Sequence, residues 1–410
     1  MRRSELESRI LILVTLALVA FGIVCVYSAT SAPAAVGGGN PNYYVERQVL
    51  YAVLGLVLMV IAQRLDYHRL RALAPMLVLV SLGLLLAVLA IGPDVNGARR
   101  WLAIGPAVFQ PSELAKLALA VWAAGYLSRR PAPRTLKQLG RPIGLLAGVF
   151  ALLILAEPDL GTTITLFVVL GAVLLVAGTP VRVLGAGVAI AASLGGLAIW
   201  IEPYMRARVL SFLNPWGDSQ GAGYQSAQAM VGMGSGGIFG AGLGNGIAKI
   251  FYLPEASTDM IYANIGEELG LVGATCVILA YMSYAYAGLK IALGARDPFG
   301  KRLAVGLTVL VCGQAFINIA AVMGMAPLTG IPLPFLSYGG SSLVVLLASA
   351  GILLNIAQRG HEETVAVRDR RRGNGRARPA RARSSGRPDS TRRVRDVRRV
   401  AGSGRSAARS

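Results

Sequence analysis

Charged side chains are scarce in this chain: Lys, Arg, Asp and Glu make up 15% of its 410 residues, whereas 54% are hydrophobic. A soluble protein of this length could not bury so much apolar surface. The scarcity of charge therefore excludes an ordinary soluble globular fold and favours a membrane protein.

Cysteine and histidine are rarer still, with three and two copies. Cys25, Cys276 and Cys312 all fall inside apolar runs, and their spacing matches no metal-binding or redox motif. We interpret them as small buried hydrophobic residues. No dedicated set of metal ligands is visible in the sequence.

Apolar runs close to the roughly 20 residues that cross a bilayer recur along the chain. The first is too long for a signal peptide and lacks a cleavage site, so we interpret it as a retained helix. The sequence predicts an all-α polytopic membrane protein, residues 1–358, with about ten transmembrane helices. The ten runs are 10–30, 49–63, 73–91, 111–127, 143–156, 161–178, 183–201, 261–289, 303–323 and 339–357.

The cations indicate the orientation in the membrane. Arginine and lysine gather in the loops after the second, fourth and eighth runs, and such loops face the cytoplasm. Both termini then lie in the cytoplasm, and the large loop at about 202–260, between helices seven and eight, lies outside. His68 and His361 fall on the cytoplasmic side, so proton transfer on the outer face must use carboxylates.

Residues 359–410 form a second region of different composition. They hold 17 Arg against 5 acidic residues, which accounts for +12 of the chain's net charge of +20. The region is rich in Gly, Ser, Pro and Ala without apolar periodicity, which predicts a disordered cytoplasmic tail. Its expected partner is anionic lipid headgroups rather than nucleic acid.

Asp259 is the most informative single residue. It ends the large external loop and stands two residues before an apolar run. A carboxylate at this water–lipid boundary can act on a substrate whose head is polar and whose tail lies in the bilayer. The alternative is structural, because Thr258 and Asp259 could simply cap the following helix.

A second polar segment surrounds the start of the fourth run. Glu113 and Lys116 share a helix face and can pair inside the membrane, either to fix packing or to take part in catalysis. Arg99 and Arg100 lie in the preceding external loop, against the positive-inside trend. An anionic ligand would explain them, since guanidinium binds phosphate in a fork geometry, and interfacial snorkelling is the alternative.

Two more segments place polar groups near the outer boundary. Glu157 and Asp159 join two runs with almost no loop, and Asp159 could either cap the next helix or position a sugar hydroxyl. The segment from Pro332 to Ser342 precedes the last run, and its glycines and serines could expose N–H donors to a pyrophosphate. Close helix contact through small residues is the alternative there.

Together these segments resemble the SEDS family (shape, elongation, division and sporulation), polytopic proteins that polymerise peptidoglycan glycan strands. The resemblance covers nearly all of residues 10–358. The family's catalytic aspartate stands in a His-Thr-Asp sequence of the large external loop, which maps to Ser257-Thr258-Asp259 with serine in place of histidine. The stretches 96–101, 254–256 and 266–270 are more similar to division members than to elongation members.

The resemblance implies a substrate and a set of site residues. The substrate is lipid II, a disaccharide-peptide on undecaprenyl pyrophosphate, and Asp259 is the expected general base. Arg206 and Arg208 are further candidate cations near the leaving group. The residues expected to bind substrate or pyrophosphate are Arg99, Arg100, Trp101, Lys116, Lys249, Ser337, Gly339, Gly340 and Ser341. Supporting roles are expected for Glu113, Asp159, Thr258 and Glu268.

The resemblance also implies partners. A divalent cation, Mg²⁺ or Mn²⁺, is expected to assist, and no organic cofactor is expected. The expected protein partners are a class B penicillin-binding protein, which is a transpeptidase, and other proteins of the division machinery at the septum. The alternatives are a lipid II flippase, an elongation-type polymerase and a non-enzymatic scaffold of the division machinery.

Overall fold

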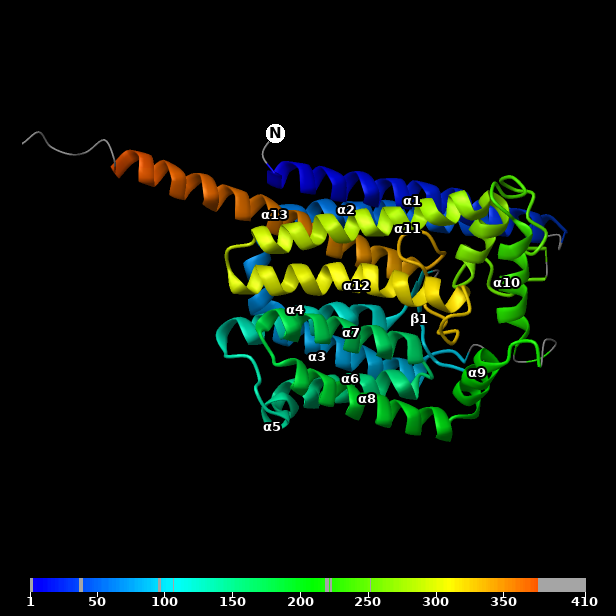
Figure 1. Ribbon diagram of the computed structural model, residues 1–410, viewed down its shortest axis with the longest axis horizontal. Helices are drawn as coiled ribbons and strands as arrows, with labels where there is room; N and C mark the ends of the chain where they lie inside the picture. Colours follow the sequence, from blue (N-terminus) through cyan, green and yellow to red (C-terminus); the bar gives the residue numbers. More distant parts are fainter. Residues whose placement is uncertain are drawn as a thin grey trace, which may run out of the picture. The chain divides into compact units, whose positions relative to one another are not determined.

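The computed structural model describes residues 3–36, 40–94, 97–105, 107–217, 221, 223–250 and 252–374 (Figure 1). Within these ranges the chain is largely helical. The helices that correspond to the expected runs are α1 (Arg3–Val36), α2 (Tyr43–Arg64), α3 (Tyr67–Ile91), α4 (Pro111–Arg129), α6 (Leu145–Ala156), α7 (Leu160–Ala177), α8 (Val181–Ile201), α11 (Ile261–Gly294), α12 (Pro298–Val322) and α13 (Gly340–Asn374). A short helix α5 (Leu136–Leu139) and a π-helical turn η1 (Gly140–Gly144) precede α6 and extend it to membrane length.

Nine helical stretches among the described residues are long and apolar enough to cross a membrane. They coincide with nine of the ten expected runs, and the remaining run, 111–127, forms α4. α4 is less apolar because it carries Glu113 and Lys116, and it packs against α3, α7 and α12. The all-α polytopic fold expected from the sequence is confirmed.

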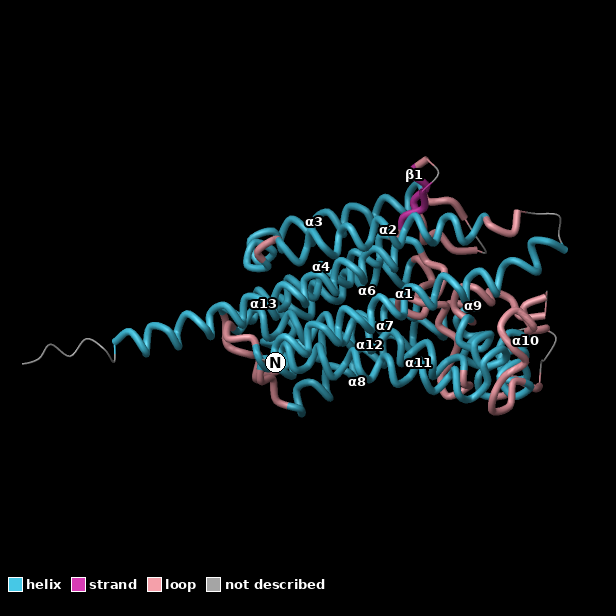
Figure 2. Tube along the Cα trace, turned by 90° about the horizontal axis from the view of Figure 1, so that it is seen from above, coloured by secondary structure: helices cyan, strands magenta, loops and turns pink. Residues whose placement is uncertain are grey.

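The long helices lie side by side with similar directions in both views (Figures 1 and 2). α1 packs against α2 and α11, α11 against α12, and α12 against α4 and α7. The most apolar part of α12 is 72% buried inside the protein, whereas α8 buries none of its own. The span Gly340–Gly360 of α13 is buried to a similar extent, 78%, so α12 and α13 form the centre of the bundle. α8 leaves its apolar side chains available to lipid.

The expected external loop is partly helical. It contains α9 (Pro203–Leu213) and α10 (Tyr224–Ser235), neither of which the sequence predicted. A two-stranded antiparallel hairpin, β1 (Leu102–Ile104) and β2 (Ala107–Phe109), precedes α4 and was not predicted either. All of these elements gather at one end of the long helices (Figure 1).

The glycine-rich segment 236–246 lies directly against α11. Ala241 and Gly242 donate their backbone N–H groups to the carbonyls of Glu267 and Glu268 at 3.0 and 2.9 Å. A Cβ atom added to Gly240 would lie 2.1 Å from the Glu268 carbonyl oxygen, so only glycine permits this approach. α11 kinks here, because Gly270 adopts a positive φ of 66°. The glycines thus allow the backbone of this segment to pack closely against α11.

The last helix differs from the expected boundary. α13 continues past residue 358 as far as Asn374, through a sequence of good helix formers such as Glu, Ala and Arg. Residues 375–410, most of the predicted tail, lie outside the described residues, as does Asn96 of the first external loop. The disordered tail and its attraction to anionic lipid stay predictions.

Candidate active site

Asp259 lies in the turn that leads from the external loop into α11. Its side chain is buried, with 6% of the residue exposed. Met260, not Asp259, occupies the N-cap position of α11, so the capping alternative does not account for the carboxylate. The hydroxyl of Thr258 lies 3.4 Å from Asp259 Oδ1, and the backbone carbonyl of Asp259 accepts a hydrogen bond from Asn318.

A cavity of about 350 Å³ opens in front of Asp259. Its walls come from segments far apart in the sequence: the start of α2, the hairpin region, the ends of α4 and α7, α9, the turn before α11 and the segment before α13. The lining residues are Arg47, Tyr51, Ala98, Arg100, Trp101, Val108, Gln110, Asp159, Thr162, Arg208, Glu255, Thr258, Asp259, Gly330, Ile331, Pro332, Tyr338, Gly339, Gly340, Ser341 and Ser342.

Burial raises the pKa of Asp259 to about 6, an effect that Arg208 opposes and Glu255 reinforces. The carboxyl is therefore mostly ionised at neutral pH, yet it is more basic than an ordinary aspartate. A general base works best when its pKa lies near the working pH. A pKa near 6 is therefore compatible with proton acceptance at neutral pH.

Two guanidinium groups converge on the same point as this carboxylate. A Cβ atom added to Gly330 would lie 3.2 Å from Nη1 of Arg208, 3.9 Å from Nη1 of Arg100 and 4.0 Å from Oδ2 of Asp259. Gly330 has a positive φ of 70°, which suits glycine. The missing side chain leaves room for a ligand atom among two cations and one carboxylate. Guanidinium pairs of this kind suit phosphate oxygens.

Arg100 is held in place by backbone carbonyls. Its Nε donates to the carbonyl of Glu157 at 2.9 Å, and Nη2 donates to the carbonyl of Pro158. The side chain of Glu157 is fully buried, and burial together with the neighbouring Asp159 raises its pKa to about 9, with Arg100 acting in the opposite direction. Glu157 is therefore neutral at pH 7, and the positive charge of Arg100 stays available to the cavity.

Asp159 both caps a helix and lines the cavity. It accepts hydrogen bonds from the backbone N–H and the hydroxyl of Thr162 at 2.9 and 2.7 Å, which fixes the start of α7. Gln110 approaches the same carboxylate at 3.4 Å. Asp159 thus caps α7, as the sequence offered as one alternative, and it also lines the cavity.

The segment before α13 reaches the cavity through part of its expected set. Gly339, Gly340 and Ser341 line the wall, and the Ser341 hydroxyl accepts from the backbone of Gln110 at 3.0 Å. Ser337 does not line it. Its buried hydroxyl instead accepts from the backbone N–H of Leu333 at 2.8 Å and shapes the turn.

Several residues expected to bind substrate lie elsewhere. Lys116 is buried and pairs with Glu113 at 2.8 Å and with the Gln314 side chain at 2.7 Å. Lys249 is buried and pairs with Glu268 at 2.6 Å. Arg99 is exposed outside the cavity. A lysine or arginine near the outer boundary can form an ion pair inside the protein as readily as it can face a ligand. Charge and position in the sequence do not distinguish these two arrangements.

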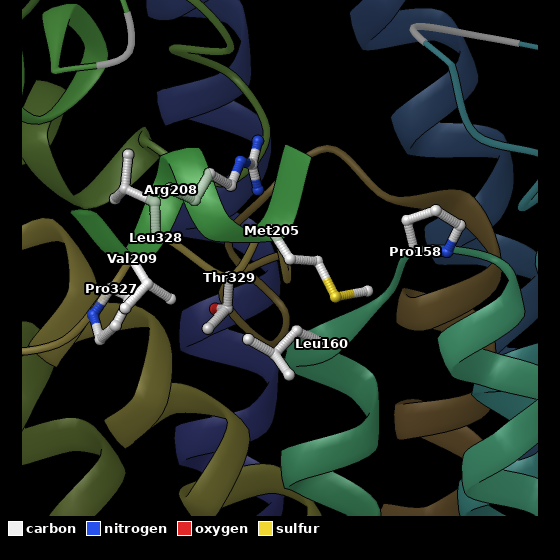
Figure 3. A pocket seen from close by; sticks show the side chains of 8 residues that line it. All are labelled: Pro158, Leu160, Met205, Arg208, Val209, Pro327, Leu328 and Thr329. Carbon is white, nitrogen blue, oxygen red and sulfur yellow. The ribbon is translucent and has the colours of Figure 1, made fainter. Parts of the chain in front are cut away.

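A second, much smaller cavity of about 10 Å³ lies behind Arg208. Figure 3 shows Met205 and Arg208 of α9 facing the loop from Pro327 to Thr329, with the Arg208 guanidinium pointing away from Pro327. The space is about the minimum for one water molecule, so it cannot take a substrate. Arg208 lines both cavities, and the small size of this one shows that α9 packs tightly against the loop beside the large cavity.

Some lining residues were not singled out from the sequence. Arg47 and Tyr51 belong to α2, and Gln110 and Gly330 stand beside recognised motifs. Asn318 lies outside the lining but holds the Asp259 backbone. Nothing local marks these residues, because they reach the site only through packing of distant helices.

The family model described as "Cell cycle protein", which groups FtsW, RodA and SpoVE, matches residues 8–362. The chain belongs to this family. It is 40% identical over 367 residues to the "Probable peptidoglycan glycosyltransferase FtsW" of Geobacter sp. (strain M18), covering 88% of this chain and 99% of the relative. It is 37% identical over 354 residues to the "Stage V sporulation protein E" of Bacillus subtilis (strain 168), covering 85% and 96%.

Solved structures agree with this membership. The fold matches a chain from a structure described as "Structural coordination of polymerization and crosslinking by a peptidoglycan synthase complex", with a TM-score of 0.72, 32% identity and 86% and 98% of the two chains covered. It also matches the rod shape determining protein RodA of Thermus thermophilus, with a TM-score of 0.64, 29% identity and 86% and 96% covered. The match therefore extends over nearly the whole of each family member.

Proposed function

We propose that this protein polymerises lipid II into β-1,4-linked glycan strands for septal cell-wall synthesis, with Asp259 as the general base. The protein is a peptidoglycan glycosyltransferase: it belongs to the family described above, and its relatives carry that name over almost their full length. Lipid II as substrate, the role of Asp259 and the division site belong to the proposal. The observation that carries the proposal is a buried aspartate with a raised pKa, Asp259, beside Arg100 and Arg208 in one cavity.

The proposed step is a displacement at the anomeric carbon of the donor chain. Asp259 accepts the proton of the acceptor sugar's 4-hydroxyl while the oxygen forms its bond to the anomeric carbon. The bond from that carbon to the pyrophosphate breaks, and the leaving group takes the electron pair. Attack opposite the leaving group inverts an α-linked donor to a β-linked product. A carboxylate is too weak a base to act before the bond forms, so both events coincide.

Arg100 and Arg208 supply the charge that the leaving group needs. Negative charge grows on the pyrophosphate as it departs, and cations already in position stabilise it without reorganisation. Both guanidinium groups lie within 4 Å of the open space at Gly330, on the side of the cavity where Asp259 also points. This juxtaposition supports a leaving-group subsite next to the base.

A divalent cation stays an expectation of the family resemblance. Among the described residues no group of three histidine, cysteine or acidic side chains lies close enough to hold a metal ion. The cavity carboxylate Asp159 already accepts hydrogen bonds from Thr162 and Gln110. The described side chains therefore offer no dedicated metal site.

For the location and the partner, too, a general statement is shown and the finer one is proposed. The protein is a multi-pass membrane protein of this family. A class B penicillin-binding protein as its transpeptidase partner, other division proteins, and placement at the septum are proposals that the FtsW names of its relatives support. Co-purification with each candidate transpeptidase from the same cell would test the first of these.

Polymerisation of purified lipid II by the reconstituted protein tests the function. The reaction is run in detergent, alone and with the candidate transpeptidase, because a polymerase needs no second compartment. Long glycan strands on a gel support the proposal. If no polymer forms in either condition and labelled lipid II crosses the membrane of vesicles that contain the protein, the result contradicts the polymerase and supports a flippase.

A further inference from the structure

A row of aromatic rings leads from the catalytic turn, residues 255–260 with Asp259, to the start of α2. The ring of Tyr44 meets the ring of Tyr338 edge-on, with centroids 5.2 Å apart, and meets Tyr43 in the same way at 5.3 Å. The guanidinium of Arg47 lies 4.5 Å above the ring of Tyr43. We call Tyr43, Tyr44, Arg47 and Tyr338 the aromatic row.

The row begins at the catalytic turn itself. The backbone N–H of Tyr338 donates to the carbonyl of Ser257 at 2.8 Å, two residues before Asp259. Tyr338 and Arg47 line the cavity, together with Trp101. Tyr43 and Tyr44 are 44% and 38% exposed. Arg47 covers one face of Tyr43, and the rest of both rings is partly uncovered beside the cavity, where a ligand that leaves it along this side can reach them.

Packing of α2 holds the row in position. The Gln48 side chain is buried and donates to the Ser337 carbonyl at 3.2 Å. A Cβ atom on Gly340 would lie 2.5 Å from the ring of Tyr51, so this ring rests directly on the start of α13. Tyr44, Gln48 and Tyr51 recur at the spacing of one helix face. These contacts fix the α2 backbone beside the cavity, and the edge-on contact with Tyr338 orients the Tyr44 ring, so this ring needs less ordering when a ligand binds.

Rigid aromatic rings beside hydrogen-bond donors suit a sugar. A pyranose ring presents C–H groups on its faces, which match the electron-rich face of a phenol ring. Its hydroxyl and acetamido groups lie around the edge, where Arg47 and the tyrosine hydroxyls can donate. A row of several rings suits a chain of linked sugars better than a single small ligand.

We propose that the aromatic row is a saccharide subsite that binds an N-acetylated aminosugar ring next to the reaction centre. This inference rests on the proposed function and deepens it. The sugar comes from one of two sources, the disaccharide of an incoming lipid II or the glycan strand already made. The first source makes the row a determinant of substrate affinity, and the second makes it a determinant of strand length.

The test compares Tyr44→Leu with Tyr44→Phe and with Tyr286→Leu. Leucine keeps an apolar side chain but removes the ring, whereas phenylalanine keeps the ring. Tyr286 is the matched control: it is 51% exposed on α11, and Lys290, four residues on, lies 5.5 Å above its ring, as Arg47 does for Tyr43. Tyr286 does not line the cavity.

Two readouts are taken on each reconstituted variant. The first is saturation-transfer NMR with chitotetraose, a soluble β-1,4 oligomer of N-acetylglucosamine, which reports binding without catalysis. The second is lipid II polymerisation, followed as KM and as strand length. We expect Tyr44→Leu to weaken chitotetraose binding roughly threefold to tenfold, the size of one aromatic contact. Tyr44→Phe and Tyr286→Leu should bind as the unaltered protein does.

The polymerisation assay separates the two sources. A raised KM for lipid II in Tyr44→Leu assigns the subsite to the incoming disaccharide, and shorter strands at unchanged KM assign it to the product. Equal binding, KM and strand length in Tyr44→Leu and Tyr286→Leu would overturn the subsite while leaving the polymerase intact. Failure of the unaltered protein to make polymer would instead overturn the proposed function, and chitotetraose binding is read independently of that result.

Discussion

Asn318 and Asp259 are joined by a hydrogen bond in which the Asn318 side-chain amide donates to the Asp259 backbone carbonyl at 2.8 Å. The same amide nitrogen donates to the Ile331 carbonyl at 2.9 Å, next to Gly330. Asn318 is buried and belongs to α12, one of the two most buried spans of the bundle. One buried amide therefore links the turn at Asp259 to the Gly330 segment.

Polymerisation should show an acid limb near pH 6. The pKa of Asp259 is raised to about 6, so the carboxyl is protonated below that pH and cannot accept the acceptor's proton. The rate, measured as kcat/KM for lipid II, should rise with pH through this value and then level off. A limb that stays near pH 4 would mean that the group controlling the rate is not this buried aspartate.

Two neighbours should move that limb in opposite directions. Arg208 lowers the pKa of Asp259 and Glu255 raises it. Arg208→Gln should therefore shift the acid limb to higher pH, and Glu255→Gln should shift it to lower pH. The same pH series on both variants checks the sign. Identical limbs in all three proteins would contradict the electrostatic arrangement described here.

Gly330→Ala should abolish most of the polymerisation rate while lowering the unfolding temperature only modestly. The new methyl group would fill the space among Arg208, Arg100 and Asp259 at 3.2 to 4.0 Å, where the leaving group is proposed to sit. The positive φ adds a conformational cost of about 1–2 kcal/mol. Thermal unfolding in detergent and polymerisation rate are measured on the same sample.

Gly178→Ala is the matched control for this change. Gly178 ends α7 with a φ of 94°, and an added Cβ there meets no atom within 4 Å. It should lose stability by a similar amount and keep its activity. Equal activity losses in both variants would show that backbone strain, not filling of the site, is responsible.

Lys249→Met should destabilise the protein without a direct effect on the substrate. Lys249 and Glu268 form a buried pair, with Ser28 of α1 bonded to both. Removing one partner leaves an uncompensated buried charge and costs about 3–5 kcal/mol. Unfolding temperature is the readout. The double variant Lys249→Met with Glu268→Gln should recover most of the loss, and an equally low unfolding temperature would contradict the pairing.

Hydropathy predicted the spans well because it is a property of contiguous residues. The run expected at 161–178 is α7 at Leu160–Ala177, and the run at 183–201 is α8 at Val181–Ile201. The hairpin around Gly105 was missed because strands of three residues carry too little alternation to be recognised. The predicted start of the tail at residue 359 was too early, because the high arginine content of the region outweighed the good helix formers at its beginning.

The candidate site was predictable only where a motif marks it. Asp259, Arg100 and Gly339 to Ser341 were recognised from motifs and line one cavity. The pairing of Lys116 with Glu113 was offered from their helix spacing and is present. Only the fold reveals the other inward partners, which are Gln314 for Lys116, 198 residues away, and Glu268 for Lys249. Arg47 and Asn318 carry no local signal, since distant helices bring them close to Asp259.

The most direct test of the account is the polymerisation of purified lipid II by Asp259→Asn beside the unaltered protein, both reconstituted and both checked for insertion and unfolding temperature. Asparagine keeps the shape of the side chain but cannot accept a proton as a base. We predict long glycan strands from the unaltered protein and none from Asp259→Asn at an equal unfolding temperature. Strands of similar yield from both proteins would contradict a catalytic role for Asp259.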